Sequence, residues 1–448
     1  MFYTETLSQT LPELFLHFGQ VPGTVWLDSA KANPHTPQFS YLAFDPDWVL
    51  TASGNQGLLT TSGTTTSIAN VVEWLSESLI FDNSLKAPFP FSGGYLAVVG
   101  YEAGAWFSAN PVPVCAKPGP LPELILGYYT HVVVWNHHLN QGTYVHQSSS
   151  KKDSKPVSFD SILSRYPKQN LGTFQASHPD FETTQAGYET DIDRVLAAIA
   201  EGTVYQVNLS HRLSASYKGD VRRFYTQLRQ RSASPFGAFM SLPDSGFIAS
   251  ASPEQFFSLH HNTLVSRPIK GTIARGKTPA EDQANAQTLL NHPKENAELT
   301  MITDLIRNDL GQVCAYGTVE VTTLKTLETY EQVFHLVSTV QGQVSPEFSA
   351  LDVLRHLFPG GSVTGTPKSS ATQLIAELEP SPRSVYTGAI GFLSSTGDAH
   401  FNVAIRTAYG SENQLYFHAG GGIVADSVPA AEWQETLDKA QGVVLSLV

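Results

Sequence analysis

Residues 266–275 read Ser-Arg-Pro-Ile-Lys-Gly-Thr-Ile-Ala-Arg, and the rest of the chain can be interpreted outward from this stretch. A strand-like run precedes it, and Pro268 should end that strand because proline has no N–H to donate. Gly271 frees the backbone directly after Lys270. We therefore expect Lys270 to stand alone at the mouth of a turn.

Lys270 has an arginine on each side in the sequence, Arg267 and Arg275. Crowding by cations favours the neutral amine, which is the nucleophilic form of lysine. A nucleophilic lysine is therefore one hypothesis for this position, but the stretch on its own favours a solvated loop lysine. The motifs elsewhere in the chain have to decide between the two.

Composition and charge argue against several classes of protein. The chain has 448 residues and a net charge of −13 with no block of lysine and arginine, so nucleic acid is not an expected partner. Its two cysteines, Cys115 and Cys314, form no CxxC pair, which is typical of a reducing compartment and argues against a disulfide framework or a zinc site. The sequence shows no signal peptide and no run long enough to span a membrane, so we expect a soluble, cytoplasmic protein.

The patterns divide the chain into three regions. Residues 1–150 are β-rich, with short runs of Val, Tyr, Phe and Trp between turn residues. Residues 151–180 are rich in polar residues and proline and are predicted to be a linker or surface excursion. In residues 181–448, which contain Lys270, amphipathic helices and strands follow one another.

Three acidic positions stand out in this last region. Glu298 shares an apolar face of the helix predicted over residues 293–310. A carboxylate there is costly unless it is paired or binds a metal, and the alternative is a rim position that reaches water. Glu432 and Glu435 share one face of the final helix with Lys439, and by pattern alone that face is solvated.

Other polar residues lie in apolar or glycine-rich surroundings. Glu254 follows a predicted strand, and His335 alternates with valines, as a lone core histidine often does. Arg406 shares a face with small residues on one strand predicted over 400–409, which leaves room for a pocket. Residues 360–368 resemble a phosphate loop but lack the lysine after the last glycine; they start a helix instead.

In this order, these pieces resemble the chorismate-utilising enzymes, whose members make anthranilate, aminodeoxychorismate, isochorismate or salicylate. The dense motifs run from about Tyr188 to the C-terminus, and residues 93–101 also look familial. The resemblance implies an α+β fold in which large antiparallel β-sheets pack as a sandwich with helices on the outside. It also implies that residues 181–448 form the chorismate-binding catalytic domain.

The resemblance assigns a magnesium site to the two acidic helices. The motif at 294–298 implies that Glu298 binds magnesium, and the motif at 431–436 implies that Glu435 is a second ligand with Glu432 beside it. Magnesium is a hard cation that suits carboxylates and water. It would bridge these acids to a carboxylate of the substrate, which explains how an acidic site accepts a dianion.

The resemblance also assigns substrate-binding and catalytic residues. His335 matches a histidine near the ring of the substrate and its leaving hydroxyl, and Glu254 matches the general acid/base. The positions that match those holding the carboxylates of the substrate are Arg406, Tyr386, Lys439, Ser362, Gly420 and Gly422.

Two positions distinguish the members of the family. Lys270 is the mark of the members that aminate chorismate at C4, whereas anthranilate synthases carry alanine there. Isochorismate-forming members have a water-activating lysine where this chain has Gln206. The resemblance therefore implies C4 amination, toward 4-aminobenzoate and folate. Glu254 would protonate the C4 hydroxyl, Lys270 would attack C2, and ammonia would then add at C4.

Neither cysteine lies in a nucleophile turn, so we expect a separate glutamine amidotransferase subunit to deliver ammonia. Anthranilate or isochorismate synthesis is the main alternative, and a non-catalytic β-rich binding protein is a remote one. Anthranilate synthases sense tryptophan through a Leu-Leu-Glu-Ser-like segment near the N-terminus. The comparable stretch here, residues 26–29, reads Trp-Leu-Asp-Ser and departs from that pattern. A regulatory tryptophan site is therefore not expected, and a structural remnant of such a pocket is the alternative.

Overall fold

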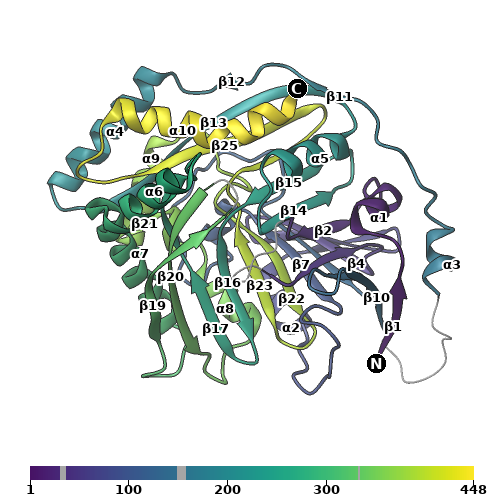
Figure 1. Cartoon of the computed structure of the whole chain (residues 1–448). Helices are drawn as coiled ribbons and strands as arrows, with labels where there is room; N and C mark the ends of the chain where they lie inside the picture. The colour runs from purple at the N-terminus through teal and green to yellow at the C-terminus, as the bar shows by residue number, and fades with distance from the viewer. Residues whose placement is uncertain (31–36, 149–157, 331–332) are drawn as a thin grey trace.

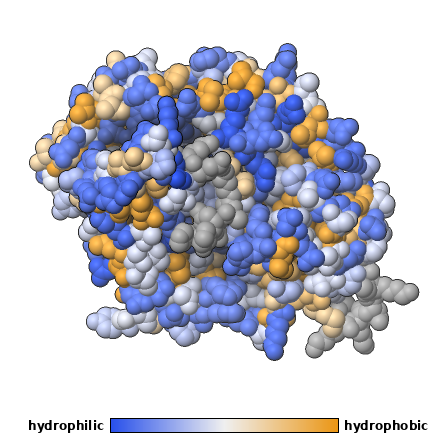
Figure 2. All heavy atoms as spheres, viewed as in Figure 1, coloured by the Kyte–Doolittle hydropathy of each residue, from blue (hydrophilic) through white to orange (hydrophobic). Residues whose placement is uncertain are grey.

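The computed structural model describes residues 1–30, 37–148, 158–330 and 333–448. Two large antiparallel sheets form the centre of the molecule, and the long helices lie outside them (Figure 1). This arrangement confirms the predicted α+β sandwich. The face in Figure 2 is hydrophilic over most of its area, with hydrophobic residues scattered among polar ones.

The first sheet contains 13 strands, and its order begins at the N-terminal strand. Along the sheet the strands are β1 (Phe2–Leu7), β10 (Gln141–Gln147), β9 (His131–Asn136), β3 (Phe39–Ala43), β2 (Val25–Asp28), β14 (Phe236–Ser241), β15 (Phe247–Ser252), β24 (Thr407–Ser411), β25 (Gln414–Ile423), β13 (Gln206–Gly219) and β11 (Phe174–Ala176). Two short strands, β12 (Asp180–Phe181) and β21 (Gly365–Thr366), also pair with β13.

The second sheet contains 12 strands and begins with the strand of Lys270. Along this sheet the strands are β18 (Ile269–Ala274), β20 (Val333–Gln343), β17 (Thr263–Arg267), β16 (Gln255–His260), β23 (Ala399–Val403), β22 (Ala389–Ser394), β7 (Gly94–Val99), β8 (Leu124–Tyr129), β4 (Trp48–Ser53), β5 (Gln56–Thr61) and β6 (Thr64–Ile68). A twelfth strand, β19 (Glu320–Thr329), pairs with β20.

Apolar side chains from both sheets meet in a shared core. Val25 and Ile248 of the first sheet are buried in one cluster with Val98 and Ile390 of the second. Burying such side chains contributes roughly 1.5–3 kcal/mol each. The sheets therefore pack face to face. Side chains alternate between the two faces of each strand, and the apolar ones point toward the other sheet.

Ten helices lie in the described ranges, mostly on the outer faces of the sheets. They are α1 (Leu11–Phe18), α2 (Val71–Ser78), α3 (Phe159–Leu163), α4 (Gln185–Ala200), α5 (Val221–Arg231), α6 (Pro279–Asn291), α7 (Pro293–Gly311), α8 (Ala350–Leu357), α9 (Lys368–Leu378) and α10 (Pro429–Val444). Helix α10 packs on β25 and α4, and α7 packs on β18, β19 and β20. None of these helices is long and apolar enough to cross a membrane.

The predicted regions 1–150 and 181–448 share both sheets. Strand β2 pairs with β14 in the first sheet, and β7 pairs with β22 in the second. Whether residues 1–150 act as a separate unit stays a prediction, although their strands continue into those of the later region. Part of the predicted linker, residues 151–157, lies outside the described residues.

The predicted turn around Lys270 is wrong. Strands β17 and β18 both pair with β20, one after the other. Pro268 lies between them, and the chain does not reverse its direction there. The proline fits because it lies between the two paired segments, where its carbonyl accepts from Ser338 N at 3.2 Å. The register shifts by one residue between Lys270 and Thr272, and Gly271 adopts φ +76° there. The glycine thus marks a β-bulge that redirects the lysine.

The single strand predicted over 400–409 is also wrong. The chain leaves the second sheet at the end of β23 and enters the first sheet at β24. Arg406 lies in this crossover with φ +51°, and its carbonyl accepts from Ala251 N at 3.1 Å. Alternation in the sequence continued across the crossover, and it therefore concealed the change of sheet.

Candidate active site

The amine of Lys270 lies between the two sheets, close to the glycine-rich part of β25. A Cβ atom added to Gly422 would lie 3.3 Å from Lys270 Nζ and 2.4 Å from Gln206 Nε2. The bare backbone of β25 is therefore what leaves room beside the amine. Gln206, at 1 % exposed, has no hydrogen-bond partner for either side-chain polar atom.

The predicted cationic crowding of Lys270 is wrong. Arg267 forms an ion pair with Glu328, and Arg275 forms one with Asp282 at 2.6 Å, so both arginines are engaged away from the amine. The charged partner of Lys270 is instead the carboxylate of Glu298. Sequence proximity misled here because each arginine pairs with an acid of its own.

Helix α7 supplies the acids that face Lys270. Glu298 Oε2 lies 3.6 Å from Lys270 Nζ, and Glu298 Oε1 lies 3.9 Å from Lys294 Nζ. The side chain of Glu298 is 13 % exposed, so it occupies a rim position next to the buried face of α7. Glu295, one turn earlier, points the same way, and burial followed by the charge of Glu298 raises its pKa.

Helix α10, which packs on β25 of the first sheet, supplies a second set of charged side chains. Lys439 Nζ lies 2.6 Å from Glu435 Oε1 and donates to Gly420 O at 3.0 Å. Glu432 is 6 % exposed and accepts from Ser427 Oγ at 2.6 Å. Glu435 and Lys439 are exposed, as the pattern predicted for this face, whereas the expectation is wrong for Glu432, which is buried.

The charges of the two helices act on each other. Burial alone would raise the pKa of Glu435, but Lys439, Lys270 and Lys294 outweigh it, and the pKa is lowered. Burial raises the pKa of Glu432, and Glu435 adds to this effect. The side chain of Glu435 is 51 % exposed although its titration responds to three lysines, as expected of a group that lines an open recess.

The acids of the two helices fit a hard divalent cation. A Cβ atom on Gly421 would lie 3.2 Å from Glu432 Oε2 and 3.6 Å from Glu435 Oε1, so the missing side chain leaves a cradle beside carboxylate oxygens. Carboxylates are ligands that Mg²⁺ prefers. Among the described residues no group of three or more acidic, histidine or cysteine side chains converges on one point. Lys270 and Lys439 instead balance the acids.

Glu254 lies between β15 and β16, just after the end of the strand that the sequence predicts before it. It is 8 % exposed, and burial raises its pKa, against the opposing effects of a hydrogen bond from Ser362 and the charges of Lys270 and Lys439. A buried carboxyl with a raised pKa can remain protonated and donate its proton. The response to both lysines places Glu254 within reach of the charged groups from both sheets.

His335 lies on β20 beside the bulge of β18. Its Nδ1 lies 2.8 Å from Thr272 Oγ1, and Tyr330 packs edge-on against its ring at 5.1 Å. Burial, followed by the charge of Arg406, lowers the pKa of His335 to about 4, so the ring is neutral near pH 7. Arg406 is exposed to solvent, yet its surroundings lower the pKa of its guanidinium by partial burial.

Tyr386 lies apart from the acids of α7 and α10, beside the buried guanidinium of Arg383, which is 5.7 Å from the centre of its ring. It is 4 % exposed, and its ring stacks at 5.0 Å on His418 of β25. It therefore packs against the strand that carries Gly420 and Gly422. Its direct contact with substrate stays a prediction.

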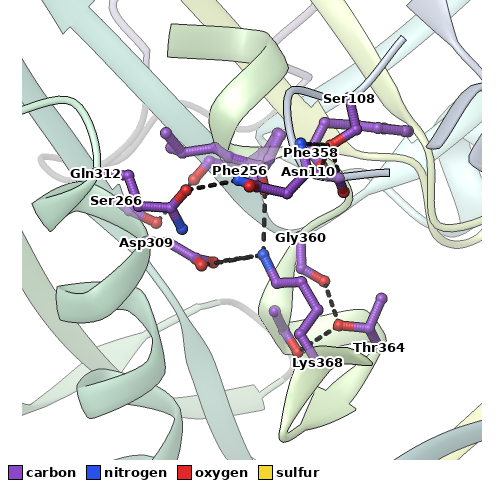
Figure 3. Close-up of polar contacts among 12 residues, drawn as sticks. Ser108, Asn110, Phe256, Ser266, Asp309, Gln312, Phe358, Gly360, Thr364 and Lys368 are labelled. Atoms are coloured by element: carbon purple, nitrogen blue, oxygen red, sulfur yellow. Dashed lines mark hydrogen bonds and ion pairs between the residues drawn. The ribbon is translucent and has the colours of Figure 1, made fainter. Parts of the chain in front are cut away.

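The loop that carries Ser362 is tied to helix α7 (Figure 3). Lys368 Nζ donates to the two carboxylate oxygens of Asp309 at 3.0 and 2.9 Å, and Asp309 is 2 % exposed. Within the loop Thr364 Oγ1 donates to Gly360 O at 3.0 Å. The ion pair thus ties α7, the helix of Glu298, to the start of α9, directly after the loop of Ser362.

A separate cavity of about 390 Å³ lies against the stretch that departs from the tryptophan-sensing pattern. Leu27, Asp28 and Ser29 line it together with residues of the second sheet such as Phe392. None of the predicted site residues is among the described residues that line this cavity. It is therefore distinct from the recess at Lys270.

Sequence reasoning missed several members of the site. Glu295 could have been found, because it precedes Glu298 by three residues on one helix. Arg383 and Glu379 could not, since their role depends on contacts with distant strands, Arg383 Nη2 donating to Asn208 O at 2.6 Å. The structure brings the remaining predicted residues together from both sheets, and their catalytic roles stay predictions.

Comparison with known proteins gives the chain a family. A sequence profile of the chorismate binding enzymes matches residues 24–444. Aminodeoxychorismate synthase component 1 of Salmonella typhimurium strain LT2 is 36 % identical over 434 residues, covering 96 % of this chain and 94 % of that protein. Anthranilate synthase component 1 of Lactococcus lactis strain IL1403 is 32 % identical, covering 94 % and 93 %.

A solved structure agrees with these sequence relatives. The crystal structure of anthranilate synthase component I from Streptococcus pneumoniae TIGR4 superposes with a TM-score of 0.78 at 29 % identity, covering 92 % of this chain and 93 % of that one. The profile and the relatives span nearly the whole chain, from β2 to α10. The chain therefore belongs to the chorismate binding enzyme family and is a chorismate-utilising enzyme.

Proposed function

We propose that this enzyme aminates chorismate at C4 and forms 4-amino-4-deoxychorismate, the precursor of 4-aminobenzoate and folate. The observation that carries the proposal is the amine of Lys270, which lies beside Glu298 and faces the bare backbone at Gly422. Relatives named for anthranilate synthesis are nearly as similar as those named for aminodeoxychorismate synthesis, so overall identity does not choose between them. The choice rests on positions 270 and 206.

The proposed chemistry divides one difficult displacement into two easier ones. Glu254 donates its proton to the C4 hydroxyl, which leaves as water, since hydroxide is a poor leaving group. The amine of Lys270, after losing a proton, attacks C2 and the diene shifts as that water departs. Ammonia then adds at C4, the double bonds shift back, and the lysine amine is expelled. Overall, chorismate and ammonia give the amino product and water.

The remaining site residues bind and orient the substrate in this proposal. Arg406 and Lys439 provide positive charge for the two carboxylates, and the backbone at Ser362 and Gly420 lies where the family's motifs place carboxylate contacts. His335 is neutral near pH 7 and is held by Thr272 through Nδ1, so Nε2 is left for the ring hydroxyl. A neutral imidazole can hydrogen-bond there without adding a charge.

Magnesium is part of the proposal. Glu298 and Glu435 would hold it, with Glu432 beside them, and the bound cation would offset the negative charge of the acids and of a substrate carboxylate. The cradle at Gly421 supports this assignment.

The ammonia is proposed to come from a separate glutamine amidotransferase subunit. Both cysteines are free thiols, and burial raises the pKa of Cys314 to about 11, so its nucleophilic thiolate is scarce. Cys115 lies in the proline-rich loop between Pro111 and Pro122. With glutamine as the only nitrogen source, the purified chain alone should therefore make no product.

The product assay tests the proposal directly. Purified protein is incubated with chorismate, Mg²⁺ and an ammonium salt, and a 4-amino-4-deoxychorismate lyase is added. Formation of 4-aminobenzoate supports C4 amination. Anthranilate or isochorismate as the sole product would reject it and favour the corresponding relatives.

A further inference from the structure

The residues proposed to hold the carboxylates of chorismate come from three separate segments. Ser362 lies in the short turn Gly361–Val363, Gly420 and Gly422 lie in β25, and Tyr386 follows α9. A rigid dianion binds well only if these segments keep fixed distances from one another. The structure must therefore contain something that locks them together.

The guanidinium of Arg383 reaches two of the three segments. Arg383 is 1 % exposed. Its Nη1 donates to Val363 O at 3.0 Å, directly after Ser362, and its Nη2 donates to Asn208 O at 2.6 Å. Asn208 pairs with Gly422 across β13 and β25. One planar group thus fixes the distance between the turn and the glycine-rich strand.

The third segment is held by the same residue. Tyr386 N donates to Arg383 O at 3.0 Å, and the guanidinium lies 5.7 Å from the centre of the Tyr386 ring. It also lies 4.8 Å from the ring of Tyr101 on the other side. Contacts between a buried guanidinium and aromatic rings are favourable and fix the plane of both groups.

Glu379 completes the arrangement. It accepts from Arg383 Nε at 2.7 Å and from Nη2 at 2.6 Å, a bidentate pair. Its Oε1 also accepts from Ser210 N at 2.8 Å and from Ser210 Oγ at 2.9 Å. Ser210 pairs with Gly420. The carboxylate therefore holds the other end of the same glycine-rich strand.

We propose that Arg383 is a positioning residue that keeps the turn of Ser362, the strand of Gly420 and Gly422, and Tyr386 in register for chorismate. This inference rests on the substrate-binding positions of the proposed function. A lysine cannot replace the guanidinium, because one ammonium group cannot donate in the fixed fork that reaches both carbonyls and Glu379. Loss of the fork should therefore weaken chorismate binding beyond any loss of stability.

The chain contains a matched control for this test. Arg222, at the start of α5, is also 1 % exposed and pairs with Asp220 through Nε at 3.0 Å and Nη2 at 2.7 Å. It also donates to the carbonyls of Gln169 and Asn170 at 3.2 and 3.3 Å. Its contacts are all local to α5 and the chain before β11. Arg222→Lys should cost similar stability and leave the site untouched.

The experiment is a calorimetric titration of chorismate into the full-length protein with Mg²⁺ and without ammonia. Arg383→Lys should raise the Kd for chorismate by about tenfold or more, because small misplacements of binding groups are costly. Arg222→Lys should keep the Kd within twofold of wild type, at a similar fall in melting temperature. The binding stoichiometry separates a loss of folded protein from a loss of affinity.

Two outcomes would overturn the inference: an unchanged Kd in a folded Arg383→Lys protein, or an equal rise in both variants. If Arg383→Lys does not fold, Glu379→Gln decides, since it keeps the volume and weakens the fork. It should raise the Kd by about threefold or more, and an unchanged Kd would overturn the inference. Binding is measured without turnover, so a failure of the proposed C4 amination would show in the product assay alone.

Discussion

Two clusters of charged side chains serve the same site and are built in opposite ways. The open cluster consists of Lys270, Glu298, Glu435 and Lys439. The buried cluster consists of Arg383, Glu379 and Glu102. In the open cluster Lys270 and Glu298 are 3.6 Å apart, and the side chains of Lys439 and Glu435 are 41 % and 51 % exposed. In the buried cluster Arg383 and Glu379 share two hydrogen bonds at 2.7 and 2.6 Å.

The difference follows from what each cluster has to do. Groups that react or bind a cation need partners that substrate or metal can reach and replace, so solvent-accessible pairs suit them. Groups that hold backbone segments together need every donor and acceptor satisfied, because an unpaired buried charge is costly. Substitutions in the open cluster should therefore change activity, and substitutions in the buried cluster should change stability or substrate affinity.

The largest expected effect concerns Glu254, which both lysines of the open cluster influence. Glu254→Gln should lower kcat by about 10²–10⁴-fold, the usual contribution of a general acid. Because the acid acts in its protonated form, wild-type kcat should fall as pH rises through the raised pKa of Glu254. A pH profile of kcat checks this prediction. A Glu254→Gln profile with the same alkaline limb would assign that limb to another group.

The next effect concerns Lys270. Lys270→Ala should lower kcat by about 100-fold, which corresponds to about 2.7 kcal/mol in activation free energy. The melting temperature should change little, because the amine has only a loose partner at 3.6 Å. Lys277→Ala, an exposed lysine beyond the same strand, is the control. Wild-type rates in Lys270→Ala would make that amine a bystander and break the comparison.

The third effect concerns the proposed magnesium ligands, one on each helix of the open cluster. Glu298→Gln and Glu435→Gln should each raise the Mg²⁺ concentration for half-maximal activity by about tenfold or more, since removing even indirect support of a metal costs about 10–100-fold. Glu377→Gln, on the exposed face of α9, is the matched control. Melting temperatures without Mg²⁺ should stay near wild type. Unchanged Mg²⁺ dependence in both variants would refute the metal assignment.

The smallest effect tests the buried cluster through pH. Glu102 accepts from Arg383 N and Ser384 N, both at 2.8 Å, and burial raises its pKa to about 7. The folded state therefore keeps this proton up to a higher pH than the unfolded state, and stability falls as pH rises from 6 to 8, by about 1 kcal/mol. Urea unfolding at several pH values measures it.

A matched variant gives this pH dependence its control. Glu102→Gln has no proton to lose, so its stability should vary less between pH 6 and pH 8 than that of wild type. If the two proteins show the same pH dependence, the titrating group lies elsewhere. Kinetic constants should respond less to this variant than to any change in the open cluster.

Much of the fold could be predicted from local patterns. The predicted helix over residues 429–444 and the predicted strand over 247–252 agree with α10 and β15, because amphipathic periodicity reports which face is buried. The same periodicity does not report what covers that face. Glu432 was therefore expected in solvent, although it is buried beside Gly421 of β25, whereas Glu435 is exposed as expected.

The errors at Pro268 and Arg406 have a similar cause. A proline breaks a strand only where its missing N–H is needed, and Pro268 lies between two paired segments of β20. Alternation continued past the crossover at Arg406, so the change of sheet left no trace in the pattern. Arg383 and Glu379 were missed because their contacts are with distant segments, Arg383 donating to the carbonyls of Val363 and Asn208 and Glu379 accepting from Ser210 N.

The shared sheets have a consequence for how the chain is made. The free edge of β7 is completed by β22, and the free edge of β2 is completed by β14. On the ribosome both N-terminal edges emerge long before their partners are synthesised, and unpaired edges recruit other strands. Fragments that stop before Ala389 should therefore aggregate, and the nascent chain should depend on chaperones until its last third has been translated.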